Sequence, residues 1–253
     1  MKATIITSCF NRVDTIRATI ESVLSQTWTD LEYIVVDGGS TDGSREIIDK
    51  YRDRIDKVIF KADHGMYEGI NNGIREATGD IIALCHSDDV LYDRHTVEAV
   101  VRVFEQQPQT EMVYADGIFV NDKTGKASRI WKGGNVNRWR LACGWLPLHT
   151  TCYVRKEVYE RYGCYDESYR IAADTKFLLN IIYRQHIAST YLPRYVVKMR
   201  MGGVSTDRNK RNAMWQEDIR VFHETGFRFP TVMKIMKMTW KPAQFVKAWF
   251  QNI

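Results

Sequence analysis

An apolar run that ends at two adjacent acids is the feature of this chain with the clearest chemical meaning. Residues 81–85 read IIALC, and Asp88 and Asp89 follow after two intervening residues. Such an apolar run is typical of a buried strand, and ligands of open α/β sheets bind beyond the carboxyl ends of strands. Two carboxylates there favour a divalent cation that carries phosphate oxygens. The pair predicts a metal–phosphate site for a nucleotide-linked substrate, with a solvated helix start as the alternative.

Polar residues also follow the first two expected strands. The first strand leads through Thr7 to Asn11 without the glycines of a G-x-G-x-x-G fingerprint, so an NAD or FAD site is not indicated. The second strand ends at Asp37, which opens the glycine-rich turn DGGSTDGS and is placed to accept hydrogen bonds from a base or ribose. A tight turn in which Asp42 caps the next helix is the alternative interpretation.

Four further polar residues are candidates for chemistry. Asp63 follows the third expected strand, and Asn71 lies in the next helical segment, beside a helix-weakening Gly73. Asp174 is an isolated acid in the apolar sequence IAADTKF. Two interpretations stay open for it: a base with a raised pKa, or a helix N-cap. His149 is a lone histidine, of a kind that is more often structural than catalytic.

The elements that must position these residues alternate between strand and helix up to about residue 110. This alternation predicts a parallel sheet with helices on both faces. Residues 131–145, rich in Gly, Asn and Trp, are expected to form an irregular loop. The expected strands are residues 3–7, 33–36, 57–60, 80–85, 112–120 and 191–200. The expected helices are residues 16–24, 47–51, 66–77, 97–104, 156–162, 174–183 and 212–223.

Composition narrows the class of protein. The 253 residues are 44% apolar and 26% charged, which is ordinary for a globular protein. A net charge of +5 is too mild for a nucleic-acid-binding surface over the whole chain, so no nucleic acid partner is expected. Five cysteines without a C-x-x-C pair indicate neither a disulfide framework nor a zinc site. No leader or membrane-length apolar run is visible, which predicts a cytoplasmic protein.

The C-terminal tail, residues 226–253, is basic and contains no acid. Lys234, Lys237 and Lys241 fall on one helical face, and Pro242 is expected to break or restart the helix. Lysines interleaved with Trp and Phe suit a helix that lies on an anionic membrane surface. A helix docked on the domain fits the same pattern, so both interpretations stay open.

In order and spacing, these motifs resemble the family 2 glycosyltransferases, in particular the non-processive members that build bacterial surface polysaccharides. The resemblance covers roughly residues 3–205. The processive members of the family carry a Q-x-x-R-W motif after the base, and none follows Asp174. The resemblance therefore implies one sugar transfer per encounter. The segments that carry it are 5–11, 36–43, 63–67, 71–74, 77–80, 87–89, 163–166, 172–174 and 202–205.

The resemblance implies an α/β fold of the GT-A type: a Rossmann-like mixed sheet, mostly parallel, flanked by helices and followed by a helical C-terminal tail. Residues 1–225 would form one GT-A domain, with the basic amphipathic tail at 226–253. Within the domain, residues 1–115 would bind the nucleotide-sugar, and residues 116–225 would form the acceptor and catalytic half.

The resemblance also assigns roles to the candidate residues. Thr7 and Asp37 would hold the nucleobase, with Asn11 shaping the pocket, and Asp63 and Asn71 would complete the donor site.

On the same resemblance, Asp88 would bind the ribose. Asp89 would ligate Mn²⁺ or Mg²⁺ that bridges the donor diphosphate, and Asp174 would be the general base. His149 and Trp145 mark the acceptor region, although Trp145 could equally belong to the core.

The expected activity is inverting transfer of a sugar from a nucleotide-diphosphate sugar, UDP-linked by default, to a hydroxyl of a saccharide or polyprenyl-linked saccharide. The tail would allow contact with the inner face of the cell membrane. A sugar-phosphate nucleotidyltransferase is one alternative, although residues 8–12 lack that class's glycine-rich basic loop. A non-catalytic nucleotide-sugar-binding protein is the other, and the presence of both Asp89 and Asp174 argues against it.

Overall fold

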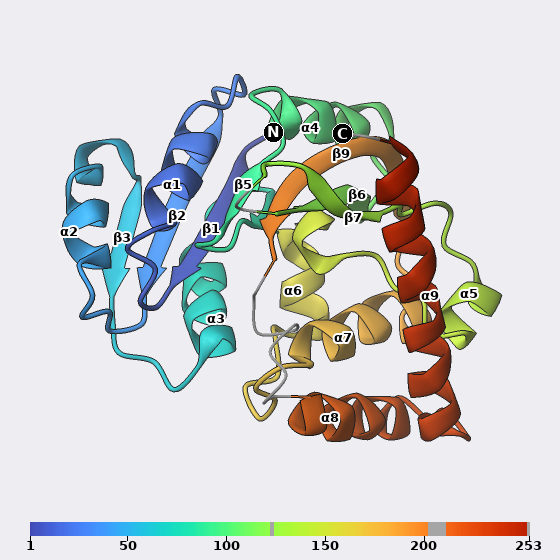
Figure 1. Cartoon of the computed structure of the whole chain (residues 1–253). Coiled ribbons are helices and arrows are strands. Elements are labelled where there is room, and N and C mark those ends of the chain that lie inside the picture. The colour runs from blue at the N-terminus through green and yellow to red at the C-terminus, as the bar shows by residue number, and fades with distance from the viewer. Residues whose placement is uncertain (122–123, 202–210, 252–253) are drawn as a thin grey trace.

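The computed structural model describes residues 1–121, 124–201 and 211–251 (Figure 1). The motif expected at 202–205 lies outside the described residues. The strands are β1 (Ala3–Cys9), β2 (Leu31–Asp37), β3 (Lys57–Phe60), β4 (Ile81–Leu84), β5 (Asp89–Leu91), β6 (Met112–Val120), β7 (Ala127–Trp131), β8 (Tyr153–Arg155) and β9 (Ser189–Arg200). The helices are α1 (Ile16–Leu24), α2 (Ser44–Asp49), α3 (Met66–Glu76), α4 (Thr96–Gln106), α5 (Arg138–Ala142), α6 (Lys156–Tyr162), α7 (Ala173–Leu178), α8 (Arg211–Glu224) and α9 (Pro230–Gln251). Shorter turns are η1 (Arg52–Arg54), η2 (His149–Thr151) and the π-helical η3 (Leu179–Arg184).

The described strands form one mixed sheet in the order β3-β2-β1-β4-β8-β6-β9-β5, with β7 paired to β6. Strands β1 to β4 run parallel to one another, so each of the segments that join β1 to β2, β2 to β3 and β3 to β4 returns to the start of the next strand. Strand β8 is antiparallel to both of its neighbours, and β6 and β9 are again parallel. The carboxyl ends of β1, β2 and β4 therefore meet at one edge of the sheet, as the sequence predicts.

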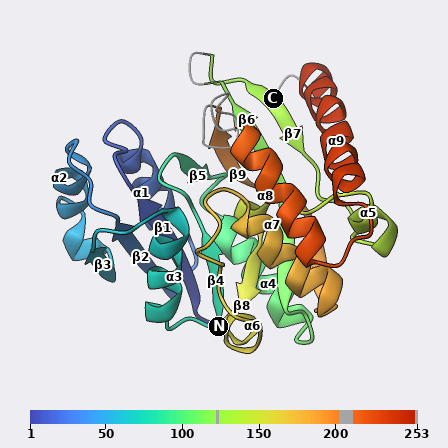
Figure 2. The same ribbon diagram turned by 90° about the horizontal axis from the view of Figure 1, so that it is seen from below.

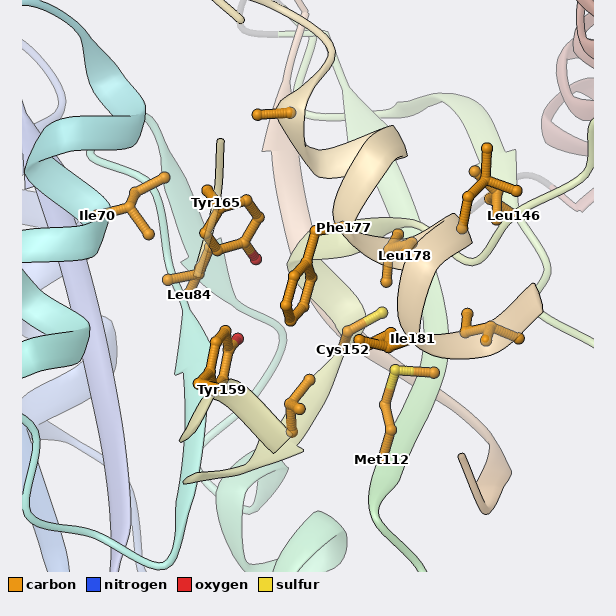
Figure 3. Packing of buried hydrophobic residues seen from close by; sticks show 14 of the residues in the cluster. Ile70, Leu84, Met112, Leu146, Cys152, Tyr159, Tyr165, Phe177, Leu178 and Ile181 are labelled. Atoms are coloured by element: carbon orange, nitrogen blue, oxygen red, sulfur yellow. The ribbon is translucent and has the colours of Figure 1, made fainter. Parts of the chain in front are cut away.

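Two apolar layers cover the sheet because side chains alternate between its faces along each strand. On β1, Ile5 belongs to a cluster with residues of α1, α2 and α4, whereas Ile6 belongs to a cluster with residues of α3, α6, α7 and α8. In the second cluster, the ring of Phe177 packs against Tyr159 and Tyr165, with ring centroids 5.0 and 4.8 Å apart (Figure 3). This aromatic contact holds α7 against α6.

Among the described residues, four elements were not expected from the sequence: the strands β5, β7 and β8 and the helix α5. Strand β5 is three residues long and pairs with β9, Asp89 lying opposite Met199. A strand that short has no readable period, so the acids at 88–89 were expected in a loop. Helix α5 and the end of β7 lie within 131–145, where an irregular loop was expected.

The C-terminal tail forms α9, which packs beside α8 at the end of the molecule remote from α2 and β3 (Figures 1 and 2). Pro242 lies inside this helix, so the expected break there is wrong. Lys234 donates to the buried carboxylate of Asp218 on α8. Lys237 donates to the same carboxylate at 2.8 Å and to the Thr175 hydroxyl of α7 at 3.0 Å. The docked interpretation of the tail is therefore confirmed for these two lysines.

Helix α9 and the turn before it also carry exposed apolar side chains, here called the outer stripe. The side chain of Lys241 lies outside the described part of the structure. No helix among residues 1–121, 124–201 and 211–251 is long and apolar enough to cross a bilayer. The outer stripe consists of Phe229, Val232, Ile235, Met238 and Phe245.

Replacing Asp218 tests how firmly α9 is docked. Asp218→Ala removes the carboxylate that Lys234 and Lys237 share and leaves the buried Lys234 without a counter-ion. The free energy of unfolding should therefore fall by about 3 kcal/mol. Chemical denaturation measures the change. Glu76→Ala, which breaks an exposed pair with Lys57, is the control and should change stability by less than about 1 kcal/mol. Equal small effects of the two variants would show that α9 is not held by this carboxylate.

Candidate active site

Asp89 opens β5 and is buried, with only 2% of its surface exposed. Its Oδ2 has no hydrogen-bond partner among the residues that the structure describes. Burial and the neighbouring charge of Asp88 raise the pKa of Asp89 well above its usual range, and a backbone hydrogen bond from Arg200 acts against them. A buried carboxylate of this kind needs a cation or a proton, which agrees with the predicted metal ligand.

Hydroxyl groups of α1 anchor the loop that carries the acid pair. Thr15 donates to the carbonyl of Ser87 at 2.7 Å, and Thr19 donates to the carbonyl of Asp89 at 2.7 Å. The carboxylate of Asp88 stays half-buried, 3.9 Å from Nε of Arg12. The two acids therefore differ in their surroundings: Asp89 is buried, whereas Asp88 is partly exposed beside Arg12.

Asp37, the last residue of β2, is fully buried. Its Oδ1 accepts hydrogen bonds from the backbone N–H groups of Gly39 and Ser40 and from Nε of Arg45, the last at 2.7 Å. Its Oδ2 has no partner within the described part of the chain. This oxygen is an acceptor available to a ligand, which fits the predicted contact with a base or ribose.

Asn11 ties the loop after β1 to the loop after β2, as a pocket-shaping residue would. Its backbone takes the left-handed conformation (φ 52°), its N–H donates to the Ser40 hydroxyl, and its Oδ1 accepts from Thr41 N–H at 2.9 Å. The neighbouring Phe10 is 57% exposed and was not singled out from the sequence. An exposed aromatic ring beside the Asp37 loop offers a stacking surface for a planar base.

The hydroxyl of Thr7 lies inside the core rather than at the edge. It donates to the Cys85 carbonyl at 2.8 Å and lies 3.0 Å from the Tyr33 hydroxyl, and the residue is fully buried. A base contact by this hydroxyl is not supported, because the side chain points toward the layer that α1 covers.

Asp63 lies against the glycines of the same edge. A Cβ atom at Gly38 would lie 2.3 Å from Oδ2 of Asp63, and one at Gly69 would lie 2.8 Å from it. Burial raises the pKa of Asp63, and the charges of Glu68 and Asp37 add to this effect. The structure thus brings Asp63 to the donor edge, with both glycines needed for the close approach.

Asn71 is engaged elsewhere. Its amide nitrogen donates to the Tyr165 carbonyl at 2.7 Å and to Oε1 of Glu167 at 2.8 Å, and its oxygen accepts from Tyr165 N–H at 3.0 Å. Both N–H groups are used within the protein. Asn71 therefore joins α3 to the loop before α7, and the predicted donor contact would have only a lone pair to use.

Asp174 is the second residue of α7, whose N-cap is Ala172, so the N-cap interpretation of this acid is wrong. Its Oδ2 lies 3.2 Å from Nδ1 of His149, and its Oδ1 accepts from Thr175 N–H at 2.7 Å. The Tyr67 hydroxyl lies 3.4 Å from Oδ1.

These contacts reverse the expected direction of the Asp174 pKa. Burial acts to raise it, but the His149 hydrogen bond and charge, the charge of Lys237 and the Thr175 N–H together lower the pKa to about 2. The expectation of a raised pKa rested on an apolar local sequence. The residues that overturn it come from distant parts of the chain, η2 and α9.

His149 also contacts a second histidine. Its Nε2 lies 2.8 Å from Nε2 of His86, which follows β4 in the loop that leads to the acid pair. Burial and the adjacent His149 lower the pKa of His86 to about 3, so the ring is neutral near pH 7. The expectation that His149 is merely structural misses this chain of contacts, and His86 was not among the predicted site residues.

A glutamate of α8 holds the loop that precedes Asp174. The carboxylate of Glu217 accepts from the N–H groups of three consecutive residues at 3.0, 2.8 and 2.9 Å. The sequence carried no signal for this contact, because the two segments are more than forty residues apart. The three donors are Arg170, Ile171 and Ala172.

Trp145 is a core residue, 3% exposed, with its ring against the Arg140 guanidinium at 4.0 Å and edge-on to Tyr114. Of the two interpretations left open for Trp145, the structure supports the core, because a side chain this buried offers no face to an acceptor sugar. Trp139, on α5, is 68% exposed instead.

The fold agrees with comparisons to known proteins. The model of glycosyl transferase family 2 matches residues 4–163. This chain therefore belongs to glycosyl transferase family 2, as the sequence motifs predict.

Its relatives are bacterial glycosyltransferases. A PGL/p-HBAD biosynthesis glycosyltransferase of Mycobacterium tuberculosis is 26% identical over 79% of this chain and 78% of its own length. An uncharacterized glycosyltransferase of Nostoc is 37% identical over 49% of this chain, which spans only 39% of that protein.

Solved structures share the fold at low identity. The mannosyltransferase PcManGT from Pyrobaculum calidifontis, in complex with GDP-Man and Mn²⁺, has a TM-score of 0.68 at 16% identity and covers 98% of this chain and 73% of its own. TarS residues 1–349 of S. aureus, in complex with UDP-GlcNAc, has a TM-score of 0.67 at 16% identity, covering 88% and 66%.

Neutralising Asp89 should stabilise the metal-free protein. Asp89→Asn removes a buried charge that lacks a partner, so the free energy of unfolding should rise by about 1 kcal/mol and Tm by about 2–4 °C. Mn²⁺ should raise the Tm of the wild type but not of this variant. Asp88→Asn, at the half-exposed neighbour, is the control and should leave the metal-free Tm unchanged. A lower metal-free Tm for Asp89→Asn, or a persisting Mn²⁺ shift, would contradict the assignment.

Proposed function

We propose that this protein is an inverting, metal-dependent glycosyltransferase that moves a sugar from a UDP-sugar to a hydroxyl of a saccharide or polyprenyl-linked saccharide. The observation that carries the proposal is the pair of partnerless carboxylate oxygens, on Asp37 and Asp89, at the carboxyl edge of a family 2 sheet. A third carboxylate, Asp174, is held separately by contacts of its own.

The residues at the carboxyl edge of the sheet are assigned to the nucleotide-sugar donor. Oδ2 of Asp37 is placed to accept a hydrogen bond from the nucleobase, beside the exposed ring of Phe10. Asp88, half-buried and next to Arg12, is assigned to the ribose. Asp63 lies between this edge and α3 and completes the donor side.

The residues present fit a divalent cation at Asp89. The buried oxygen without a partner and the raised pKa both favour a bound positive charge, and the structure of PcManGT contains Mn²⁺ with its donor. A group of three or more acidic, His or Cys ligands is not found among the described residues, so the remaining ligands would be donor oxygens and water. When bound, Mn²⁺ or Mg²⁺ supplies Lewis-acid stabilisation of the diphosphate leaving group.

Asp174 acts on the acceptor. Its low pKa keeps it ionised at neutral pH, so it can accept the proton of the acceptor hydroxyl as that oxygen bonds to the anomeric carbon. The bond from that carbon to the diphosphate breaks on the opposite side, which inverts the anomeric configuration. A base this weak takes the proton late, when the attacking oxygen has already become acidic through bond formation.

Relatives and neighbours guide the choice of substrates. TarS is bound to UDP-GlcNAc and PcManGT to GDP-Man, which leaves the nucleotide to be tested, with UDP the first choice. The mycobacterial relatives are named for PGL/p-HBAD biosynthesis, which supports a glycoconjugate acceptor. Calorimetric titration of UDP-, dTDP- and GDP-sugars, with and without Mn²⁺, decides the donor.

The outer stripe supports a place at the cytoplasmic face of the membrane. Its apolar side chains stand on a segment without acids, and Arg228 adds an exposed cation beside Phe229. Contact with anionic lipid would bring the enzyme to a polyprenyl-linked acceptor.

Replacing the proposed base separates binding from transfer. Asp174→Asn should lower kcat by about 10²- to 10⁴-fold, because the acceptor proton then has no carboxylate to receive it. The Kd of the nucleotide-sugar, measured by calorimetry, should stay within a few-fold of wild type. Asp166→Asn, which alters an acid that pairs with Lys176, is the control and should retain transfer. Transfer at near wild-type rate by Asp174→Asn would refute its role as base.

Loss of the outer stripe should weaken membrane contact. The double variant Val232→Ser with Ile235→Ser removes two apolar side chains, and its partition to phosphatidylglycerol vesicles should fall at least about tenfold. Phe60→Ser, at a partly exposed aromatic on β3, is the matched control and should sediment with vesicles like wild type. Unchanged sedimentation of the double variant would exclude the stripe as a membrane contact.

A further inference from the structure

The geometry points to His149 as a positioning residue for Asp174, with His86 fixing the form of His149 that does this. This inference rests on the proposed function, in which Asp174 is the base. The carrying observation is one chain of contacts: Oδ2 of Asp174 to Nδ1 of His149 at 3.2 Å, then Nε2 of His149 to Nε2 of His86 at 2.8 Å.

The hydrogen positions follow from the partners. An ionised carboxylate only accepts, so the proton of His149 that faces Asp174 must be on Nδ1. The two Nε2 atoms lie 2.8 Å apart, so one proton is shared between the rings. When His86 Nε2 donates that proton, His149 accepts at Nε2 and keeps its own proton on Nδ1, where it can donate to Asp174.

The same contacts separate the roles of the two residues. Both ring nitrogens of His149 already face protein partners, so neither is free to take a proton from an acceptor hydroxyl. Oδ1 of Asp174 accepts from Thr175 N–H and faces the Tyr67 hydroxyl, whereas Oδ2 faces His149 alone among the described residues and keeps a free lone pair. The side chain of Asp174 is also more exposed, 24% against 16% for His149. His149 therefore orients the base and is not itself the base.

The chain also joins the two halves of the site. His86 lies in the loop that follows β4 in the nucleotide-binding half. Its backbone carbonyl accepts a hydrogen bond from the Asp89 N–H at 2.9 Å. His149 is the first residue of η2 in the other half, and Asp174 is the second residue of α7. Through the two rings, the carboxylate that receives the acceptor proton is fixed relative to the loop that presents the donor diphosphate.

Other groups also act on Asp174 and set the background for any test of pH dependence. Burial of this carboxylate is offset by cations and donors from several elements. The titratable and charged groups that face it are His149 and His86, Tyr67 of α3, Cys152, Tyr165 and Lys237 of α9.

Two amide substitutions at His149 separate its two contacts. The side-chain nitrogen of asparagine overlays Nδ1 of a histidine, whereas that of glutamine overlays Nε2. His149→Asn should keep the donation to Asp174 and retain kcat within a few-fold. His149→Ala and His149→Gln should lower kcat about 10- to 100-fold with the donor KM unchanged.

The pH profile gives a readout that a structural role would not move. Without the N–H of His149, burial of Asp174 is less offset and its pKa rises. The acidic limb of the kcat profile should therefore move to higher pH in His149→Ala, and stay near its wild-type position in His149→Asn. Equal kcat losses in the alanine and asparagine variants, without movement of the limb, would overturn the inference.

A second pair guards against variants that fail to fold. His86→Gln keeps an N–H donor to His149, whereas His86→Ala removes it, so only the alanine variant should lower kcat and raise the acidic limb. Asp174→Asn, assayed alongside, separates the two levels of the proposal. Activity in Asp174→Asn would refute the proposed base. An inactive Asp174→Asn together with wild-type kcat and pH profile in both alanine variants would refute the positioning role alone.

Discussion

Buried carboxylates without a full set of partners are the constraint around which this protein is built. Asp37 and Asp89 each hold one oxygen that no group in the described chain satisfies, at the carboxyl edge of a parallel sheet. Such oxygens destabilise a fold unless a ligand supplies the missing proton or cation. Side-chain hydrogen bonds hold the surrounding loops. The hydroxyls of Thr15 and Thr19 bind the segment that carries Asp88 and Asp89, and Asn11 joins the loops after β1 and β2. These contacts fix the loops that carry the two unsatisfied oxygens, which lie buried at the edge where we propose that the nucleotide-sugar and its cation bind.

The third carboxylate is treated in the opposite way. Asp174 is partly exposed, and the donors and cations around it lower its pKa to about 2. The aromatic contact of Phe177 and the hydrogen bond from Lys237 of the docked tail hold its helix, α7, in place. Glu217 of α8 binds the loop that precedes this helix. The site thus combines two carboxylates that lack a partner for one oxygen, Asp37 and Asp89, with a carboxylate whose charge is stabilised by protein groups, Asp174. This division agrees with separate tasks, binding a donor diphosphate and receiving a proton from an acceptor.

Helix α9 connects the site to the surface. Its inward lysines end on Asp218 and on Thr175, next to the base, while its outward side chains form the outer stripe. Lysines on one helical face suggested lipid contact when only the sequence was considered. In the structure, Lys234 and Lys237 bind Asp218 inside the protein. The proposed membrane contact therefore rests on the outer stripe and not on these lysines. A helix docked on the domain, one of the two interpretations that the sequence left open, is therefore what these two lysines support, and the break expected at Pro242 does not occur.

The sequence by itself determined the α/β class, the order of strands and helices in the first half, and the family. These depend on local periodicity and on short motifs such as the acid pair, which survive without knowledge of distant contacts. Only the tertiary structure decided that β5 places Asp89 opposite Met199, that Thr7 and Trp145 belong to the core, and that His149 and His86 meet Asp174. The physical reason is that a side chain's pKa, exposure and hydrogen-bond partners are set by residues far away in the chain. The apolar neighbours of Asp174 in sequence predicted a raised pKa, and a histidine and a lysine from elsewhere lowered it.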